Sequence, residues 1–234
     1  YSKINEAIKF VSPVSGTLVT IKRGAKRVIT EIIIEADQLD TYRDNGVFNV
    51  SSMNSDEIKN HLLATGCWAF IKQRPYDVIA NPDVKPKAIF ISALTTAPLS
   101  ADYDFTLLGK EKELQAAVTA FSKLTDGKVN VSVGKNSKSI FEGLNDITVH
   151  KVSGVHPAGN VGTLINKVDP VNKGEVVWTV TPQDLVIIGT LFLTGKFNAK
   201  RVIALSGSSL KNPKYYTAKI GAEVSTFIYD SGLN

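Results

Sequence analysis

Hydrophobic and polar positions alternate along residues 10–36, around Gly16 and a second turn at residues 23–25. Alternation of this kind, interrupted by tight turns, predicts short antiparallel strands. A two-stranded unit of this length cannot bury its apolar face by itself. We therefore expect it either to be half of a larger β module whose other half lies upstream of Tyr1, or to pack against the residues that follow.

A short helix and a proline-rich linker are predicted next. Ser55 is expected to cap a helix over residues 56–66, because Asp56 and Glu57 lie in its first turn and Gly66 closes the pattern. Residues 67–86 then combine prolines with aromatic and basic residues. This composition is typical of a linker rather than of a regular element.

From residue 88 onward the pattern alternates between strands and helices. The apolar run 88–94 predicts a strand buried on both faces, and residues 109–127 carry apolar side chains at helical spacing. Further strands are expected at 128–133 and 146–152, with a short helix between them. This order predicts an α/β fold with a parallel sheet.

The last third of the chain continues with a strand at 176–180 and a helix at 182–195, which has Pro182 at its first position and Gly195 after its end. The alternating segments 201–207 and 215–220 predict a hairpin. A final helix is expected to begin near residue 221, and this last unit looks unfinished at Asn234.

Composition indicates a soluble globular protein without strong signs of chemistry. The chain has 234 residues, of which 43% are hydrophobic, so it can form a substantial core in one to three folding units. Its net charge is +5, but lysine and arginine are scattered rather than clustered with aromatic residues. This distribution favours a solvated basic surface over a nucleic-acid site.

Several site types are excluded by residue counts and spacing. The single Cys67 rules out an internal disulfide and a cysteine-rich metal site, which fits a reducing cytoplasm. No two of His61, His150 and His156 have the spacing of a helical metal pair, so no metal is expected. Apolar runs fall short of the roughly 20 residues that a membrane helix needs, and no secretory signal opens the chain.

The segment 154–163, GVHPAGNVGT, is the first candidate for function. Gly159 and Gly162 resemble part of a dinucleotide fingerprint, but the first glycine pair is missing. Pro170 and Gly174 argue against a long helix that would point its N-terminus at a phosphate. We interpret the segment as a structural turn, with a phosphate site as the alternative, and keep His156 as an exposed residue of possible interest.

The second candidate is the aromatic and cationic part of the linker, Trp68, Phe70, Arg74 and Tyr76. Aromatic rings beside one positive group can hold a flat ligand such as a quinone or a base, by stacking and by a hydrogen bond to a carbonyl. The alternative is that these rings only cover an edge of the sheet. The sequence alone leaves both open.

Six segments, in order, resemble the NqrA family, whose members are the A subunits of the bacterial Na+-translocating NADH:quinone oxidoreductase. The match covers nearly the whole chain and about the middle of an NqrA protein. The segments are SPVSGTLVTIKRGAKRVI (12–29), GCWAFIKQRPYDVIANP (66–82), AIFISALTTAPLSAD (88–102), GVHPAGNVGTLINKVDPV (154–171), TPQDLVIIGTLFLTG (181–195) and VIALSGSSLKNP (202–213).

The resemblance implies three domains. Residues 1–39 would be a barrel-sandwich, lipoyl-like fragment without a lysine-bearing hairpin. Residues 40–195 would be a Rossmann-like α/β domain similar to the flavin-bearing subunit of complex I and to the C subunit of the Rnf complex. Residues 196–234 would begin a soluble-ligand-binding β-grasp domain.

The resemblance also shows a departure from those relatives. Where the complex I relative has a glycine-rich flavin loop, only Gly66 remains, and Trp68, Phe70 and Ile71 project side chains instead. Acidic residues used around NADH are also absent or displaced. The resemblance therefore implies a protein that binds no flavin or NADH and has no catalytic residue, so that the chain alone is inactive.

The same resemblance implies a place in a larger complex. The chain would lie at the cytoplasmic face of the bacterial inner membrane, peripheral to it, with subunits B to F as partners. The complex reduces ubiquinone to ubiquinol with NADH and exports Na+. NqrA is associated with quinone binding, and we expect Trp68, Phe70, Arg74 and Tyr76 as contacts. The alternatives are an assembly scaffold and an electron-entry protein like the C subunit of the Rnf complex.

Overall fold

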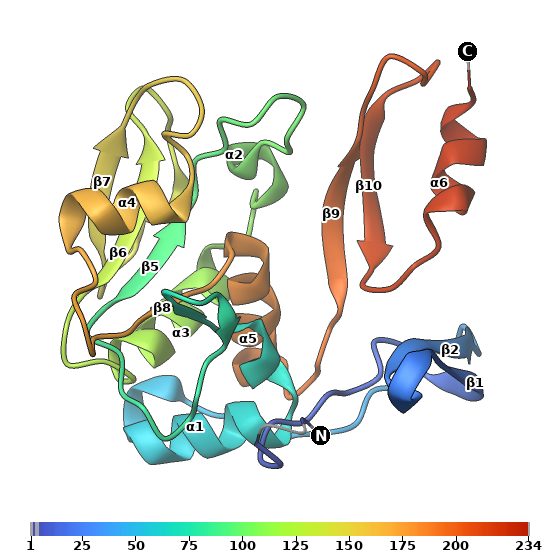
Figure 1. Cartoon of the computed structure of the whole chain (residues 1–234), viewed down its shortest axis with the longest axis horizontal. Helices are drawn as coiled ribbons and strands as arrows, with labels where there is room; N and C mark the ends of the chain where they lie inside the picture. The colour runs from blue at the N-terminus through green and yellow to red at the C-terminus, as the bar shows by residue number, and fades with distance from the viewer. Residues whose placement is uncertain (1, 3–4, 234) are drawn as a thin grey trace.

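The computed structural model describes residue 2 and residues 5–233. Three parts follow one another along the chain, namely an N-terminal hairpin, a central α/β unit, and a second hairpin with a helix (Figure 1). None of the helices in these residues is long and apolar enough to cross a membrane. The α/β class predicted from the sequence is confirmed.

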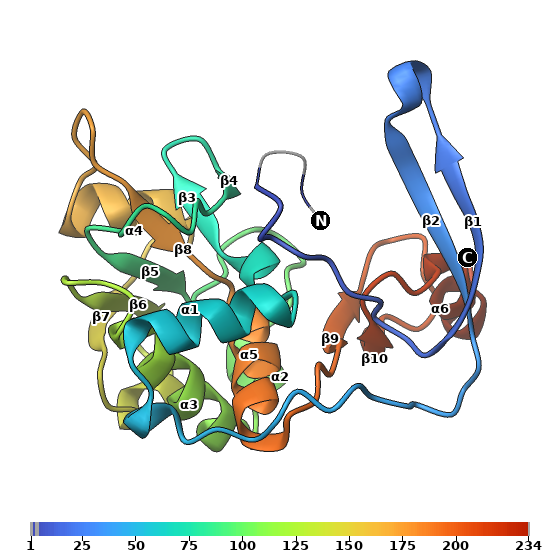
Figure 2. The same ribbon diagram turned by 90° about the horizontal axis from the view of Figure 1, so that it is seen from below.

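The N-terminal hairpin extends away from the α/β unit (Figure 2). It consists of antiparallel β1 (Gly16–Arg23) and β2 (Ile29–Ala36), joined through the 3₁₀ turn η1 (Ala25–Arg27). Leu18 and Ile32 are 55% and 54% exposed, so β1 and β2 leave apolar side chains uncovered, while Val11, before the hairpin, lies against Gly66.

The central sheet is mixed rather than parallel. Its order is β4-β3-β8-β5-β6-β7, and β8, β5, β6 and β7 are parallel to one another while β3 runs antiparallel to both of its neighbours. Residues 67–86, predicted as a linker, contain the 3₁₀ helix η3 and the hairpin β3–β4 at one edge of the sheet. The sequence did not predict this hairpin, because strands of two or three residues are too short to show an alternating pattern. The bounds are η3 (Cys67–Phe70), β3 (Lys72–Arg74), β4 (Val78–Ile79), β5 (Ile89–Ser92), β6 (Val129–Gly134), β7 (Thr148–Val152) and β8 (Val177–Thr179).

Helices cover both faces of this sheet (Figure 2). Ile89 and Ile91 of β5 pack with α1 (Ser55–Ala64), α3 (Glu111–Ser122) and α5 (Pro182–Thr194). Phe90 points to the other face and packs with α4 (Val161–Val168), so β5 is buried on both faces as predicted. The shorter elements are η2 (Val50–Ser52), α2 (Tyr103–Thr106) and η4 (Ile140–Gly143).

One predicted helix end is confirmed by the structure and another is wrong. Helix α5 has Pro182 at its start and Gly195 in the left-handed conformation after its end, with φ of 70°, as predicted. In α1 the cap is Asn54 and not Ser55. The Asn54 side chain accepts from the Glu57 backbone N–H at 2.9 Å, and the Glu57 carboxylate accepts from the Asn54 N–H at 2.8 Å.

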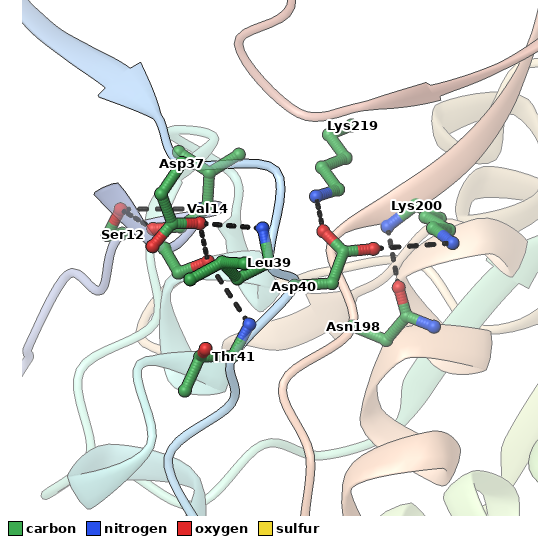
Figure 3. Close-up of polar contacts among 10 residues, drawn as sticks. Ser12, Val14, Asp37, Leu39, Asp40, Thr41, Asn198, Lys200 and Lys219 are labelled. Carbon is green, nitrogen blue, oxygen red and sulfur yellow. Dashed lines mark hydrogen bonds and ion pairs between the residues drawn. The ribbon is translucent and has the colours of Figure 1, made fainter.

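The C-terminal part is the predicted hairpin, β9 (Lys200–Leu205) paired with β10 (Lys214–Lys219), followed by α6 (Val224–Ser231). It is tied to the segment after β2 by Asp40, which accepts a hydrogen bond from Lys219 and has its carboxylate 3.9 Å from the Lys200 ammonium (Figure 3). Asp40 therefore links the chain leaving the first hairpin to both strands of the second one.

Candidate functional site

A cavity of about 890 Å³ opens at the carboxyl ends of β5 and β8. After β5 the chain forms β6 and then β7, which extend the sheet on one side of β5, and the connecting helix α3 lies on one face of the sheet. The chain then returns through α4, on the opposite face, and β8 pairs with the other side of β5. The strand order reverses between β5 and β8, which is where ligands bind in open α/β sheets. Ser92 and Thr179, at the ends of the two strands, both line the cavity.

The segment 154–163 forms one side of this cavity through Gly159 and Gly162. The Gly159 N–H donates to Thr96 Oγ1 at 2.9 Å, and Ser92 Oγ donates to the Gly159 carbonyl at 2.6 Å. A Cβ atom at Gly159 would lie 2.6 Å from the Leu94 carbonyl oxygen, so only glycine allows this close approach to the chain after β5.

One inference about this segment is wrong. We expected no helix N-terminus beside it, whereas α4 begins directly after it at Val161, with Asn160 as a cap whose side chain makes no capping hydrogen bond. The helix has only eight residues, so Pro170 limits its length without preventing its start. The segment therefore packs closely against the end of β5, and it leads directly into α4, whose first residues line the cavity.

His156 lies outside the lining of the cavity. Its side chain is exposed, and its Nδ1 is 3.4 Å from Thr96 Oγ1. Thr96 in turn lines the cavity. His156 is therefore placed to contact a neighbour of the site rather than a ligand within it.

The structure brings two of the four proposed quinone contacts, Phe70 and Arg74, to the cavity and leaves the other two away from it. Trp68 is fully buried, donates its indole N–H to the Ala80 carbonyl at 2.8 Å, and packs edge-on against Trp178. Tyr76 is 82% exposed at the turn of the β3–β4 hairpin. Ile71 is also fully buried, so of the three bulky side chains expected in place of a flavin loop, only Phe70 reaches the cavity.

Besides Lys72 and Asp77 of the β3–β4 hairpin, the lining carries two charged residues from outside the predicted linker that sequence reasoning missed, Asp184 and Arg201. Asp184 lies in the first turn of α5, is 5% exposed, and accepts hydrogen bonds from Arg201 and from Thr181 Oγ1. Burial raises the pKa of Asp184 above its usual value, although Arg201 and Thr181 act in the opposite direction. The aspartate at the start of a predicted helix was visible in the sequence, but nothing there indicated its distant partner.

Comparison with known proteins identifies the family to which these features belong. The family described as the NqrA second alpha/beta domain matches residues 53–197, which is more than half of the chain. The chain belongs to the NqrA family. The NqrA N-terminal barrel-sandwich hybrid domain matches residues 1–37, and the NqrA C-terminal domain matches 202–234.

Curated relatives agree with this assignment, and each is named as the A subunit of a Na(+)-translocating NADH-quinone reductase. The chain is 36% identical to the relative from Actinobacillus pleuropneumoniae serotype 5b, over 95% of this chain and 51% of the relative. It is 36% identical to that of Alcanivorax borkumensis, over 96% and 51%, and 34% identical to that of Neisseria meningitidis serogroup A, over 95% and 50%. The chain spans about half the length of the NqrA relatives that it matches.

The cavity is not confined to the NqrA second alpha/beta domain. Phe70, Arg74, Gly159 and Asp184 lie within the match to that domain, whereas Arg201 lies in the short interval between residues 197 and 202 that separates two NqrA domain matches. One side of the site therefore comes from the connection between two domains.

Proposed function

We propose that the chain is part of the NqrA protein of a Na+-translocating NADH:quinone reductase and binds quinone in the cavity between β5 and β8. Membership of the NqrA family supports the first part. The observation that carries the second is the cavity itself, at the reversal of strand order, with the Phe70 ring and the Arg74 guanidinium on its lining. Quinone is the substrate of the complex, which reduces ubiquinone to ubiquinol with NADH and exports Na+.

The contribution of this chain is to bind and orient the quinone, and no electron-transfer step is assigned to its residues. The flat ring of a quinone stacks on an aromatic side chain such as Phe70, and its carbonyl oxygens accept hydrogen bonds from a cation such as Arg74. Arg74 Nε is 3.3 Å from the carboxylate of Asp77, a residue of the same hairpin that also lines the cavity. Trp68 and Tyr76 are not part of this proposal because neither lines the cavity.

The assignment of the domains is also part of the proposal. Residues 1–39 are the barrel-sandwich fragment, 40–195 the Rossmann-like domain and 196–234 the start of a β-grasp domain. The chain would lie peripherally at the cytoplasmic face of the bacterial inner membrane, against the other subunits, B to F, of the complex.

We infer that the chain binds neither flavin nor NADH. A glycine such as Gly159 could let a phosphate approach the backbone. Here, however, Leu94 and Thr96 already lie against the Gly159 backbone. The Phe70 ring also lines this cavity. One observation favours the alternative of an electron-entry protein like the C subunit of the Rnf complex, namely that α4 begins beside the cavity without a side-chain cap.

The decisive experiment is to purify the 234-residue chain, record its visible spectrum, and titrate it in parallel with a short-chain quinone and with NADH. We expect a colourless protein, saturable heat with quinone, and none with NADH. Phe70→Ala should weaken quinone binding, while Tyr76→Ala, which alters an exposed ring outside the cavity, should not. A yellow protein would support the electron-entry alternative, and the absence of any saturable heat would support a scaffold.

A further inference from the structure

One side of the cavity is formed by β9, which follows the α/β unit in the chain. Arg201, the second residue of β9, lines the cavity together with Phe70 and Asp184. These three residues come from η3, α5 and β9, and no local sequence motif contains them together. Their contacts with one another determine what this side of the cavity can bind.

The backbone of β9 is fixed at this point by α5. The Gln183 side chain donates from Nε2 to the Val202 carbonyl at 2.8 Å and accepts from the Val202 N–H at 2.8 Å. This pair of hydrogen bonds has the form of a strand pairing, and it holds the residue next to Arg201 against the first turn of α5. The position of Arg201 is therefore set by the main chain on one side.

The guanidinium of Arg201 is fixed independently. Its Nη2 donates to Asp184 Oδ1, and its Cζ lies 5.6 Å from the centre of the Phe70 ring. Phe70 stacks in turn on Phe197, with ring centres 6.0 Å apart and planes 8° from parallel. An arginine held by a buried carboxylate and by an aromatic face has little freedom to lose when it binds a ligand.

Arg74 differs in this respect. Its side chain is as exposed as that of Arg201, at 30% against 29%, but its carboxylate partner Asp77 is 57% exposed, whereas the side chain of Asp184 is 7% exposed. An exposed pair within one hairpin orders its side chains weakly. Of the two arginines on the lining, Arg201 is the preorganised hydrogen-bond donor.

The charge of Arg201 is matched by Asp184, and this bears on the ligand. A guanidinium paired with a buried carboxylate still offers N–H groups, but its positive charge is largely balanced. Such a donor suits a neutral carbonyl better than a phosphate. A quinone, with a flat ring and two carbonyl oxygens, fits a lining of this kind.

We propose that Arg201 is the principal hydrogen-bond donor to a quinone carbonyl, so that the quinone site is composite and is completed by β9. This inference rests on the proposed function. It predicts that recognition of the carbonyl, rather than affinity for the ring, depends on Arg201.

The test compares two ligands on the same protein. One is a short-chain ubiquinone analogue, and the other is the dimethyl ether of its hydroquinone, a flat ring with the same other substituents that carries methoxy groups in place of the two carbonyls. Calorimetric titration of the full 234-residue chain gives the ratio of the two dissociation constants. We expect a preference of roughly 10-fold to 100-fold for the quinone, as for a hydrogen bond to a charged donor.

Removing Arg201 alone would leave Asp184 buried and unpaired, so the main variant is the double substitution Arg201→Gln with Asp184→Asn, which keeps a neutral hydrogen-bonding pair. Arg201→Lys keeps the charge and loses the planar donor. Lys200→Gln is the control, because Lys200 is the adjacent residue of β9 and does not line the cavity.

The double variant should lose most of the preference, by about 10-fold or more, while it still binds the ether. Arg201→Lys should lose part of the preference, and Lys200→Gln none. If the parent chain binds the quinone and the two Arg201 variants keep its full preference, the role of Arg201 is refuted while the proposed function stands. If the parent chain binds neither ligand, the proposed function itself fails.

Discussion

Replacing Gly159 by alanine is expected to separate the segment 154–163 from the end of β5. The new Cβ atom would lie 2.6 Å from the Leu94 carbonyl oxygen and 2.9 Å from both Thr96 N and Thr96 Oγ1. Ordinary contact begins near 3.4 Å, so the two segments must move apart by about 0.8 Å. Two of these three contacts are to backbone atoms, which cannot turn aside as a flexible side chain could.

The cost can be worked from the hydrogen bonds that join the two segments. Two hydrogen bonds join the segments: Ser92 Oγ donates to the Gly159 carbonyl at 2.6 Å, and the Gly159 N–H donates to Thr96 Oγ1 at 2.9 Å. A movement of about 0.8 Å would stretch the first bond and break the second. Each such bond contributes about 0.5–1.5 kcal/mol net, and alanine recovers about 0.4–1 kcal/mol by restricting the unfolded chain. Losing one bond and weakening the other, less this gain, leaves an expected destabilisation of about 0.5–2 kcal/mol for Gly159→Ala.

Gly162→Ala is the matched control. It is the same substitution three residues later, at a position in α4 where a Cβ atom would meet nothing within 4 Å. Because alanine favours a helix over glycine, this variant should be unchanged or more stable by up to about 1 kcal/mol. Urea unfolding followed by circular dichroism measures both. Equal stability of Gly159→Ala and the parent chain would refute the steric argument.

Three further predictions concern the rest of the molecule. Gly189→Ala in α5 should destabilise the fold by about 1–3 kcal/mol or more in the same assay, because its Cβ would lie 1.8 Å from the Glu113 carbonyl oxygen of α3. Burial raises the pKa of Cys67 to about 12, so a thiol reagent at about pH 8 should label it only after unfolding. The hydrogen bond from Lys219 lowers the pKa of Asp40, and Lys219→Met should raise it in an NMR titration.

Elements whose local signals agree with one another were predictable from the sequence. The helix α5 has a proline at its first position, a run of apolar residues and a glycine after its end, so each local signal agrees with the others. The strand β5 was equally clear, as a short apolar run bounded by turn residues. The order of these elements indicated the α/β class without any tertiary information.

The β3–β4 hairpin was not predictable in this way, and neither was the burial of the aromatic residues in η3 that precede it. Trp68 and Phe70 are two residues apart in η3, yet one is in the core and the other on the lining of the cavity. Composition does not distinguish them, since both are aromatic residues in a proline-rich segment. Only the path of the backbone through η3 separates them, and a turn of this kind leaves no periodicity in the sequence.

The position of Arg201 shows how a residue outside the α/β unit reaches its site. The first turn of α5 necessarily starts at the carboxyl end of β8, because the helix follows that strand after a single short turn. Gln183 and Asp184 lie in that turn, and they hold Val202 and Arg201 of β9. A strand that pairs with this turn must lie beside the cavity, whatever its own sequence. The place of Arg201 on the lining therefore follows from the topology around β8 and α5, and a substitution that breaks the Gln183 contacts should weaken carbonyl recognition without touching any residue that contacts the ligand.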